Sequence, residues 1–246
     1  MPELTQEADR LVALAEERGF QLRLLGGLAV CELCPSAQLP SLRRSYPDID
    51  FVTGRTSGPA TRSLLAENGY EGDQRFNALH GETRLLFYHE SNEWQVDVFL
   101  GEFSMCHKID LSRSLLPGRR TVPPADLLLT KLQIVEMNLK DMKDVLAILL
   151  DHPVTADTDP EAIELGRLTA ATSRDWGLYT TLTDSIARVR TDAADLLEAD
   201  LLRVVRERIT VIAEAMVAAP KSRGWRLRSR IGRRVLWYEL PDEVSR

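Results

Sequence analysis

The stretch "RRSYPDIDFV", residues 43–52, places two carboxylates inside an apolar run. Asp48 and Asp50 are separated by Ile49 and followed by two further apolar residues. This pattern predicts a β-strand in which residues i and i+2 point to the same side, so both aspartates share one face. Two like charges on one face repel each other, and the sequence should therefore supply an opposing charge nearby.

A third aspartate repeats this pattern. The segment "WQVDVFL" holds Asp97 between two valines and follows the apolar segment "RLLFYH", so the two segments are predicted to form an antiparallel hairpin. If the strand of Asp97 lies beside the strand of Asp48 and Asp50, three carboxylates converge on one patch of the sheet. A divalent cation would remove their repulsion, and oxygen-only ligands favour Mg²⁺ or the similarly hard Mn²⁺.

Two adjacent glycines, Gly26 and Gly27, stand between a predicted strand at 20–25 and a short apolar helix that ends before Pro35. Glycine lets the backbone approach a ligand closely, and a helix N-terminus offers free N–H groups to a phosphate. The same pair also suits a tight strand-to-helix turn with no ligand. Because the glycines come shortly before Asp48 on the chain, one edge of the sheet could hold both phosphates and a metal ion.

At "LLGG", "RSYPDIDF" and "VDVF" the chain resembles the nucleotidyltransferase superfamily, which includes polymerase β, the lincosamide and aminoglycoside nucleotidyltransferases, and the AbiE-type toxins. The family pattern is a glycine pair that opens a helix, a D-x-D on the next strand and a third aspartate on a later strand. Arg44 shortly before Asp48 and the downstream segment "TKLQIVEMNLKDMKDVLAILL" make the AbiE-type branch the most similar. The resemblance extends over residues 20 to 150.

The resemblance implies that a nucleoside triphosphate binds with its phosphates over the glycine pair, and that a later K/R-D-x-x-D helix completes the site. The implied nucleotide-binding residues are Gly26, Gly27, Arg44, Lys131 and Asp141. An alternative for the later helix is a solvated face on which Lys140, Asp141, Lys143 and Asp144 form local charge pairs. Lys131 stands within the apolar run "LLLTKLQIV", where a lysine must extend to solvent or meet an anion.

The resemblance also implies a chemistry for the three acids. Asp48 and Asp50 would hold Mg²⁺ (or Mn²⁺) against the triphosphate, while Asp97 would ligate a second metal ion and help the acceptor hydroxyl attack the α-phosphate. The implied reaction moves a nucleoside monophosphate from the triphosphate to a hydroxyl acceptor and releases pyrophosphate. The implied catalytic and metal-binding residues are therefore Asp48, Asp50 and Asp97.

The elements predicted along the chain give an α+β fold class with two regions. Residues 1–120 alternate helices and strands, which predicts a mixed sheet, and the resemblance makes this a nucleotidyltransferase-like domain. Residues 121–246 are expected to form a mostly helical C-terminal domain, because apolar residues recur there at helical spacing, most clearly from Leu197 to Met216. A basic tail, residues 221–238, belongs to this second region.

The net charge of −6 is unevenly distributed. Residues 221–234 contain one lysine, six arginines and no acid, which leaves −13 for the rest of the chain. With Trp225, Trp237 and Tyr238 nearby, the basic tail combines charge with stacking surface and is a candidate RNA-binding segment. The alternative is an arginine-rich strand pair folded against the acidic remainder.

Composition excludes several classes of protein. Apolar content is 44% and charged content 28%, as in soluble globular proteins, and no run approaches the roughly 18 apolar residues of a membrane helix. Three cysteines in so long a chain argue against a disulfide framework. We therefore expect a cytoplasmic protein that has no membrane partner.

The sequence leaves the acceptor and the type of function open. The acceptor is RNA, such as tRNA in toxin-type relatives, or a cationic small molecule of the antibiotic type, which the acidic remainder of the chain would attract. A third alternative is a non-catalytic nucleotide-binding protein in a toxin–antitoxin pair, with a cognate antitoxin as partner. The presence of all three acids favours an enzyme.

Overall fold

The computed structural model describes residues 2–89, 91 and 94–240, and the chain divides into two compact units. Unit 1 comprises Met1–Leu33, Arg44–Ser104 and Ile109–Val122, and unit 2 comprises Cys34–Arg43, Met105–Lys108 and Pro123–Arg246. The units interleave along the chain, whereas the domains predicted from the sequence are the continuous segments 1–120 and 121–246.

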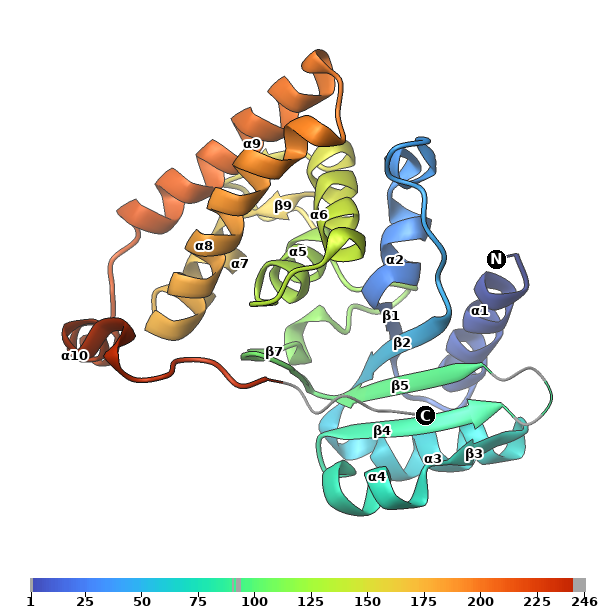
Figure 1. The fold of residues 1–246 in the computed structure, drawn as a ribbon. Helices are drawn as coiled ribbons and strands as arrows, with labels where there is room; N and C mark the ends of the chain where they lie inside the picture. The colour runs from blue at the N-terminus through green and yellow to red at the C-terminus, as the bar shows by residue number, and fades with distance from the viewer. Residues whose placement is uncertain (1, 90, 92–93, 241–246) are drawn as a thin grey trace. The chain divides into compact units, whose positions relative to one another are not determined.

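Unit 1 is built on a five-stranded mixed sheet with the strand order β1-β2-β5-β4-β3 (Figure 1). The strands are β1 (Leu22–Leu25), β2 (Asp48–Thr53), β3 (Tyr70–Gly72), β4 (Arg84–His89) and β5 (Gln95–Leu100). β2 and β5 run parallel, while the other neighbouring pairs run antiparallel. The predicted mixed sheet and the predicted antiparallel hairpin of β4 and β5 are therefore confirmed. The turn that joins the hairpin lies largely outside the described residues.

The two central strands of this sheet have one apolar face. Alternate residues along β2 and β5 point to the same side, as the period of a strand requires. The apolar side chains are fully buried, and they are Ile49, Phe51, Val96 and Val98. The three aspartates of these strands therefore share the opposite face.

Four helices accompany the sheet in unit 1. They are α1 (Pro2–Glu17), α2 (Gly26–Leu33), α3 (Gly58–Glu67) and α4 (Gln74–His80). α1 packs against β1, α2 against β2, α3 against β3 and α4 against β4. The helical spacing of apolar residues predicted α1, and the buried members of that stripe are Leu4, Ala8, Leu11, Val12 and Ala15.

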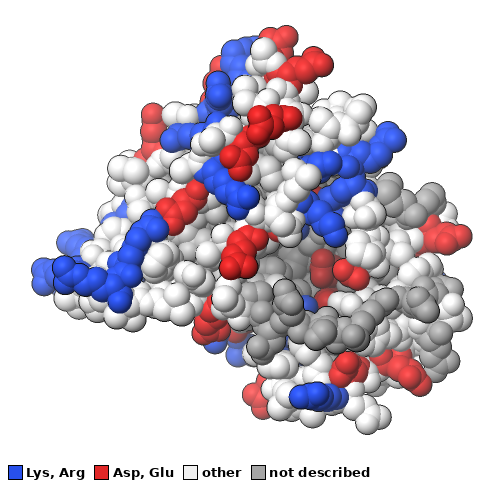
Figure 2. All heavy atoms as spheres, in the orientation of Figure 1, with Lys and Arg blue, Asp and Glu red and all other residues white. Residues whose placement is uncertain are grey.

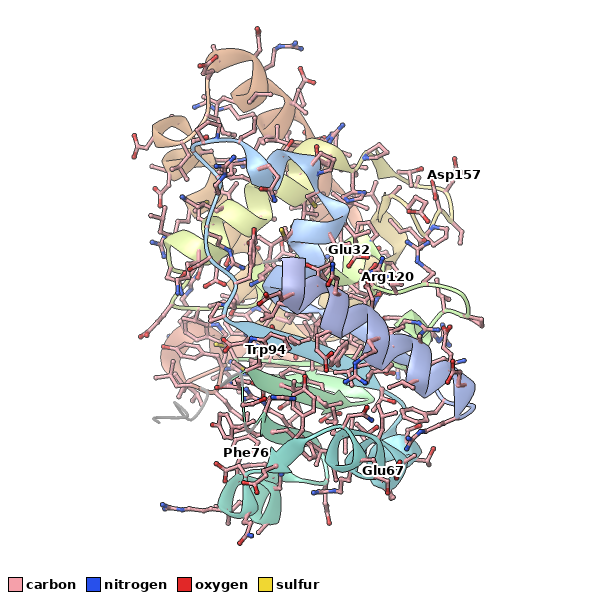
Figure 3. The ribbon with its side chains drawn as sticks, turned by 90° about the vertical axis from the view of Figure 1, so that its right-hand side faces the viewer. Glu32, Glu67, Phe76, Trp94, Arg120 and Asp157 are labelled. Carbon is pink, nitrogen blue, oxygen red and sulfur yellow. The ribbon has the colours of Figure 1, made fainter. Side chains whose placement is uncertain are left out.

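An ion pair between Glu32 and Arg120 joins the end of α2 to the rest of unit 1. Glu32 lies 3.3 Å from Arg120, which also pairs with Asp9 of α1, and Figure 3 shows Glu32 and Arg120 next to each other. Burial raises the pKa of Glu32 and lowers the pKa of Arg120, because removal from water disfavours either charge. The mutual attraction opposes that cost and fixes the helix that begins at the glycine pair.

Unit 2 is mostly helical. Its helices are α5 (Pro124–Leu132), α6 (Leu139–Asp151), α7 (Leu165–Thr172), α8 (Trp176–Asp192), α9 (Ala199–Ala218) and α10 (Arg223–Ile231). The remaining short strands of the chain are β6 (Glu102–Ser104), β7 (Lys108–Asp110), β8 (Val154–Thr155) and β9 (Ile163–Glu164). The α+β class with a helical C-terminal region agrees with the sequence prediction. None of the helices in the described part of the chain has the length and apolar character that a bilayer crossing requires.

The core of unit 2 follows the apolar stripe that the sequence predicted. Val205, Ile209, Ile212 and Met216 of α9 are all buried, and α9 packs against α6, α7 and α8. This stripe is core packing, as expected from its spacing of three and four residues. The long helix therefore gains its stability mainly from buried apolar area.

The basic tail forms a helix, and the alternative of an arginine-rich strand pair is wrong. α10 covers Arg223–Ile231, and its N-terminus is capped by Ser222, whose hydroxyl accepts a hydrogen bond from the Trp225 backbone N–H at 3.1 Å. Arginine and leucine are good helix formers, and a serine at the N-cap satisfies a backbone donor that would otherwise lack a partner. The alternation of arginines with other residues in "WRLRSR" was therefore a weaker signal than the cap.

Candidate active site

The three aspartates lie on adjacent parallel strands. In the register of β2 and β5, Asp50 is opposite Asp97 and Asp48 is opposite Gln95. Residues opposite each other in a sheet point to the same side, so all four polar side chains share one face. The predicted neighbourhood of the two strands is thus observed, and this face brings the carboxylates of Asp50 and Asp97 into adjacent positions.

Asp97 already has protein partners on both oxygens. The Arg84 guanidinium Nε donates to Asp97 Oδ1 at 2.7 Å, and the Gln95 amide Nε2 donates to Asp97 Oδ2 at 2.9 Å. Asp97 is only 2% exposed, so these contacts offset the loss of hydration of a buried charge. The opposing charge expected beside the aspartates is, for this one, an arginine of the neighbouring strand.

Sequence reasoning missed Arg84 and Gln95. Gln95 could have been found, because it stands two residues before Asp97 on the same strand and so shares its face. Arg84 could not have been assigned in this way, because its contact depends on the register between β4 and β5.

The glycine pair fits closely against the polar face. Gly26 follows β1 directly, opens α2 and has φ of 68°, a conformation that favours glycine. A Cβ at Gly26 would overlap the carboxylate of Asp50, and a Cβ at Gly27 would overlap the guanidinium of Arg44. The missing side chains therefore let a carboxylate and an arginine reach the start of α2.

Arg44 is held beside this turn by its own neighbours. Its Nη1 donates to the Ser45 carbonyl at 2.9 Å, and its Cζ lies 4.1 Å from the centroid of the Tyr46 ring. A cation over an aromatic face is stabilised by the ring's quadrupole. The guanidinium and the N-terminus of α2 consequently place positive charge next to Asp50.

The residues of this face fit a divalent cation in their chemistry. Asp48, Asp50 and Asp97 offer only hard oxygen donors, and Mg²⁺ is commonly held by one or two carboxylates together with waters and substrate phosphates. Among the described residues, however, no group of three or more His, Cys, Asp or Glu side chains is arranged to hold a metal ion. The arrangement therefore suits a cation on the pair Asp48 and Asp50, with Asp97 bonded to Arg84 and Gln95.

The remaining predicted nucleotide-binding residues, Lys131 and Asp141, lie in unit 2. Lys131 Nζ is 3.2 Å from Asp141 Oδ1 and 2.8 Å from Asp144 Oδ2, so one lysine joins α5 to two carboxylates of α6. Asp141 also forms a capping box with Asn138 at the start of α6. Asp144 is 2% exposed, which excludes the solvated helix face as its environment.

Aromatic side chains fasten the basic tail to α8. The Trp225 ring packs edge-on against Tyr179 with centroids 5.3 Å apart, and Trp237 Nε1 donates to Thr181 Oγ1 at 3.2 Å. The same hydroxyl lies 2.8 Å from Nε2 of His107, whose pKa is lowered by burial. These rings are used for packing within unit 2, so stacking on RNA bases is not their role in this structure.

The arginines of the tail divide into those whose side chains have partners and those whose side chains have none among the described residues. Arg228 donates to the carbonyls of Gly232 and Val235, and Arg233 pairs with Asp184 at 2.6 Å. The side chains of three others are exposed and form no hydrogen bond or ion pair with any described residue: Arg223, Arg230 and Arg234. Figure 2 shows Lys and Arg side chains gathered over α10.

Comparison with known proteins gives distant structural likenesses alone. No family model and no curated protein matches the chain. A lincomycin-bound lincosamide antibiotic adenylyltransferase, LnuA, is similar at 15% identity and a TM-score of 0.43, over 58% of this chain and 94% of that one. An antigenic nucleotidyltransferase-like protein from Paracoccidioides brasiliensis is similar at 16% identity and 0.45, over 90% and 95%.

A third likeness is to ANT(2'')-Ia in complex with adenylyl-2''-tobramycin. Identity is 12% and the TM-score 0.40, over 76% of this chain and 99% of that one. All three TM-scores lie below 0.5, and these likenesses are too distant to carry an argument. What the site can do therefore rests on the chain's own residues.

Proposed function

We propose that this protein is a nucleotidyltransferase that uses Mg²⁺ or Mn²⁺ to move a nucleoside monophosphate from a nucleoside triphosphate to a hydroxyl acceptor. The observation that supports it is the meeting of Asp50 with the glycine turn that opens α2, while Asp97 lies opposite Asp50 on β5. Asp50, which with Asp48 forms the carboxylate pair for a hard cation, thereby lies next to a helix N-terminus suited to phosphate.

The residues divide the work of binding. Backbone N–H groups at Gly26 and Gly27 donate to phosphate oxygens, and the Arg44 guanidinium neutralises phosphate charge. Asp48 and Asp50 would hold the cation, which would supply charge neutralisation and a template for the triphosphate. Position and electrostatics account for most of the catalysis in such transfers.

The transfer proceeds in line at the α-phosphorus. The acceptor oxygen forms a bond to phosphorus, the bond to the oxygen that bridges to the β-phosphate breaks, and pyrophosphate leaves. Asp97, whose oxygens accept from Arg84 and Gln95 in this structure, would exchange one of these bonds for the acceptor hydroxyl and take up its proton. We propose further that Lys131 and Asp141 contribute to nucleotide binding, as the resemblance implies.

Labelled nucleotide transfer tests this function. Purified protein is incubated with Mg²⁺, α-phosphate-labelled triphosphates and tRNA, and pyrophosphate release is followed in parallel. We expect transfer by the wild type and a loss of about 100-fold or more in Asp50→Asn, because an amide cannot neutralise a cation. Glu71→Gln, an exposed carboxylate of β3 in the same sheet, is the matched control and should retain the wild-type rate. Equal rates of nucleotide transfer in Asp50→Asn and in the control would exclude the proposed enzymatic function of this site.

RNA is the acceptor that we propose, since the basic tail exposes three arginines whose side chains have no partner among the described residues, two in α10 and Arg234 just after it. A small cationic acceptor of the antibiotic type is the second candidate, and the net charge of −13 outside the tail favours it. Label on tRNA supports the first, while label on an aminoglycoside alone supports the second. Label on neither, together with nucleotide binding, would favour a non-catalytic partner of a toxin–antitoxin pair, and co-purification with a cognate antitoxin would test that role.

A further inference from the structure

The residue that opposes the charge of Asp97 is Arg84, at the start of β4. In the antiparallel register Leu86 lies opposite Asp97 and Arg84 opposite Phe99, so Arg84 and Asp97 are diagonal neighbours on one face. Arg84 Nε lies 2.7 Å from Asp97 Oδ1, and the two side chains are 17% and 3% exposed. The ion pair is therefore largely out of water.

Two aromatic rings fix the guanidinium in this position. Arg84 Cζ lies 5.0 Å from the ring centroid of Phe99 and 5.3 Å from that of Phe76. Phe76 belongs to α4, which packs against β4, and Figure 3 labels it there. A guanidinium over two aromatic rings is stabilised by both. Arg84 is therefore held in place beside Asp97 and differs in this from an arginine that extends into solvent.

Both oxygens of Asp97 are engaged by the protein. Gln95 completes the set by donating to Oδ2 at 2.9 Å, while Arg84 occupies Oδ1. A cation bound by Asp97 would have to displace a charge-assisted hydrogen bond in a nearly dry environment. The described residues contain no group of three His, Cys, Asp or Glu side chains arranged to hold a metal ion. The two hydrogen bonds to Asp97 are consistent with this, because they engage both of its oxygens.

We infer that Arg84 is the resident counter-ion of Asp97, which keeps the third carboxylate out of the metal-binding set while no nucleotide is bound. A cation then meets Asp48 and Asp50 alone, and Asp97 stays oriented on the polar face without repelling Asp50. Arg84 is thus a positioning residue that acts through Asp97. This inference rests on the proposed function and deepens it.

Binding of Mn²⁺ to the nucleotide-free full-length protein, followed by electron paramagnetic resonance, tests the inference. Arg84→Gln leaves Asp97 without its counter-ion, so we expect Mn²⁺ affinity to rise by about tenfold. The double variant Arg84→Gln/Asp97→Asn replaces the whole ion pair by a neutral pair of similar shape. Its Mn²⁺ affinity should equal that of the wild type, because Asp97 contributes nothing to the wild-type site.

Two further variants separate the counter-ion from general charge effects. Arg84→Lys keeps the positive charge beside Asp97, so its Mn²⁺ affinity should stay close to the wild-type value. Arg62→Gln removes one arginine of α3 that donates to the Gly81 carbonyl at 3.3 Å, and so changes the net charge equally. It should give no gain in affinity.

Two results would overturn the inference. A double variant that binds Mn²⁺ about tenfold more weakly than the wild type would show that Asp97 is already a ligand. If folded Arg84→Gln binds Mn²⁺ with the wild-type affinity, Arg84 does not keep Asp97 from binding the cation. The double variant carries no uncompensated buried charge and keeps the test decisive if Arg84→Gln fails to fold. Because Mn²⁺ binding needs no acceptor, failure of the inference is distinguishable from absence of nucleotide transfer.

Discussion

Gly26 is required for two reasons, its backbone conformation and its close approach to Asp50. Its φ of 68° would strain any L side chain, and Asp50 occupies the place that a Cβ would take. Gly118, in the same unit, also has a positive φ, of 72°, but no atom lies within 4 Å of its missing Cβ. The two glycines therefore separate the cost of backbone strain from the cost of displacing a carboxylate.

Substitution of these glycines by alanine should give unequal losses of stability. We expect Gly118→Ala to lower the free energy of unfolding by about 1 to 2 kcal/mol, the cost of a left-handed residue with a Cβ. Gly26→Ala should lose roughly 1 to 3 kcal/mol more, because the methyl group overlaps Asp50. Urea denaturation measures both. Equal losses in the two variants would show that Asp50 does not lie against Gly26.

At the residue scale the sequence predicted the acids but not all of their partners. Asp48 and Asp50 were found because i and i+2 share a face of any strand, and Asp97 because its flanking valines follow the same rule. On each strand, this local pattern was enough to predict the face on which the aspartates lie. The pairing of Asp97 with Arg84 needs the register between two strands, which local alternation does not fix.

Among the elements, those with strong periodicity were predictable, whereas β3 and α4 were not. The alternation in β2 and β5 and the stripe of α9 identified these elements, because burial of one face imposes the period. β3 has only three residues, and α4 is a seven-residue helix whose cap, Asp73, accepts from the Phe76 N–H. Such elements are held by their neighbours more than by their own pattern.

The contact between α5 and α6 makes a prediction about Lys131. Lys131→Met should lower the free energy of unfolding by about 3 kcal/mol, because the nearly buried Asp144 loses its counter-charge. Adding Asp144→Leu should recover part of that loss, since no buried charge then remains unpaired at that position. Urea denaturation of single and double variants measures the coupling.

Lys143→Met is the matched control for this pair. Lys143 belongs to the same helix and donates to the Arg43 carbonyl at 3.0 Å, not to a carboxylate. Its loss should change stability by at most about 0.5 kcal/mol. Unchanged stability in Lys131→Met would contradict the structural pairing and leave phosphate binding as the reason for a lysine at this position.

For the whole molecule, the defining feature is the division of charge. Residues 221–234 carry +7 and the rest of the chain −13, a contrast that sequence counting alone established. The structure adds that the side chains of Arg228 and Arg233 already have partners within unit 2. The basic tail therefore offers an anion fewer arginines than its composition suggests, and the rings of Trp225 and Trp237 are engaged as well.

Salt dependence of RNA binding tests how the tail is used. Replacing the three exposed arginines by glutamine (Arg223, Arg230 and Arg234) should weaken binding to single-stranded RNA. It should also reduce the slope of log affinity against log salt concentration by about 2, since each lost phosphate contact on a single strand removes roughly 0.7. Fluorescence anisotropy at several salt concentrations measures both. A control with the same change of net charge replaces three exposed arginines elsewhere, namely Arg75, Arg113 and Arg174. If both triple variants lose slope equally, net charge and not the tail accounts for the binding.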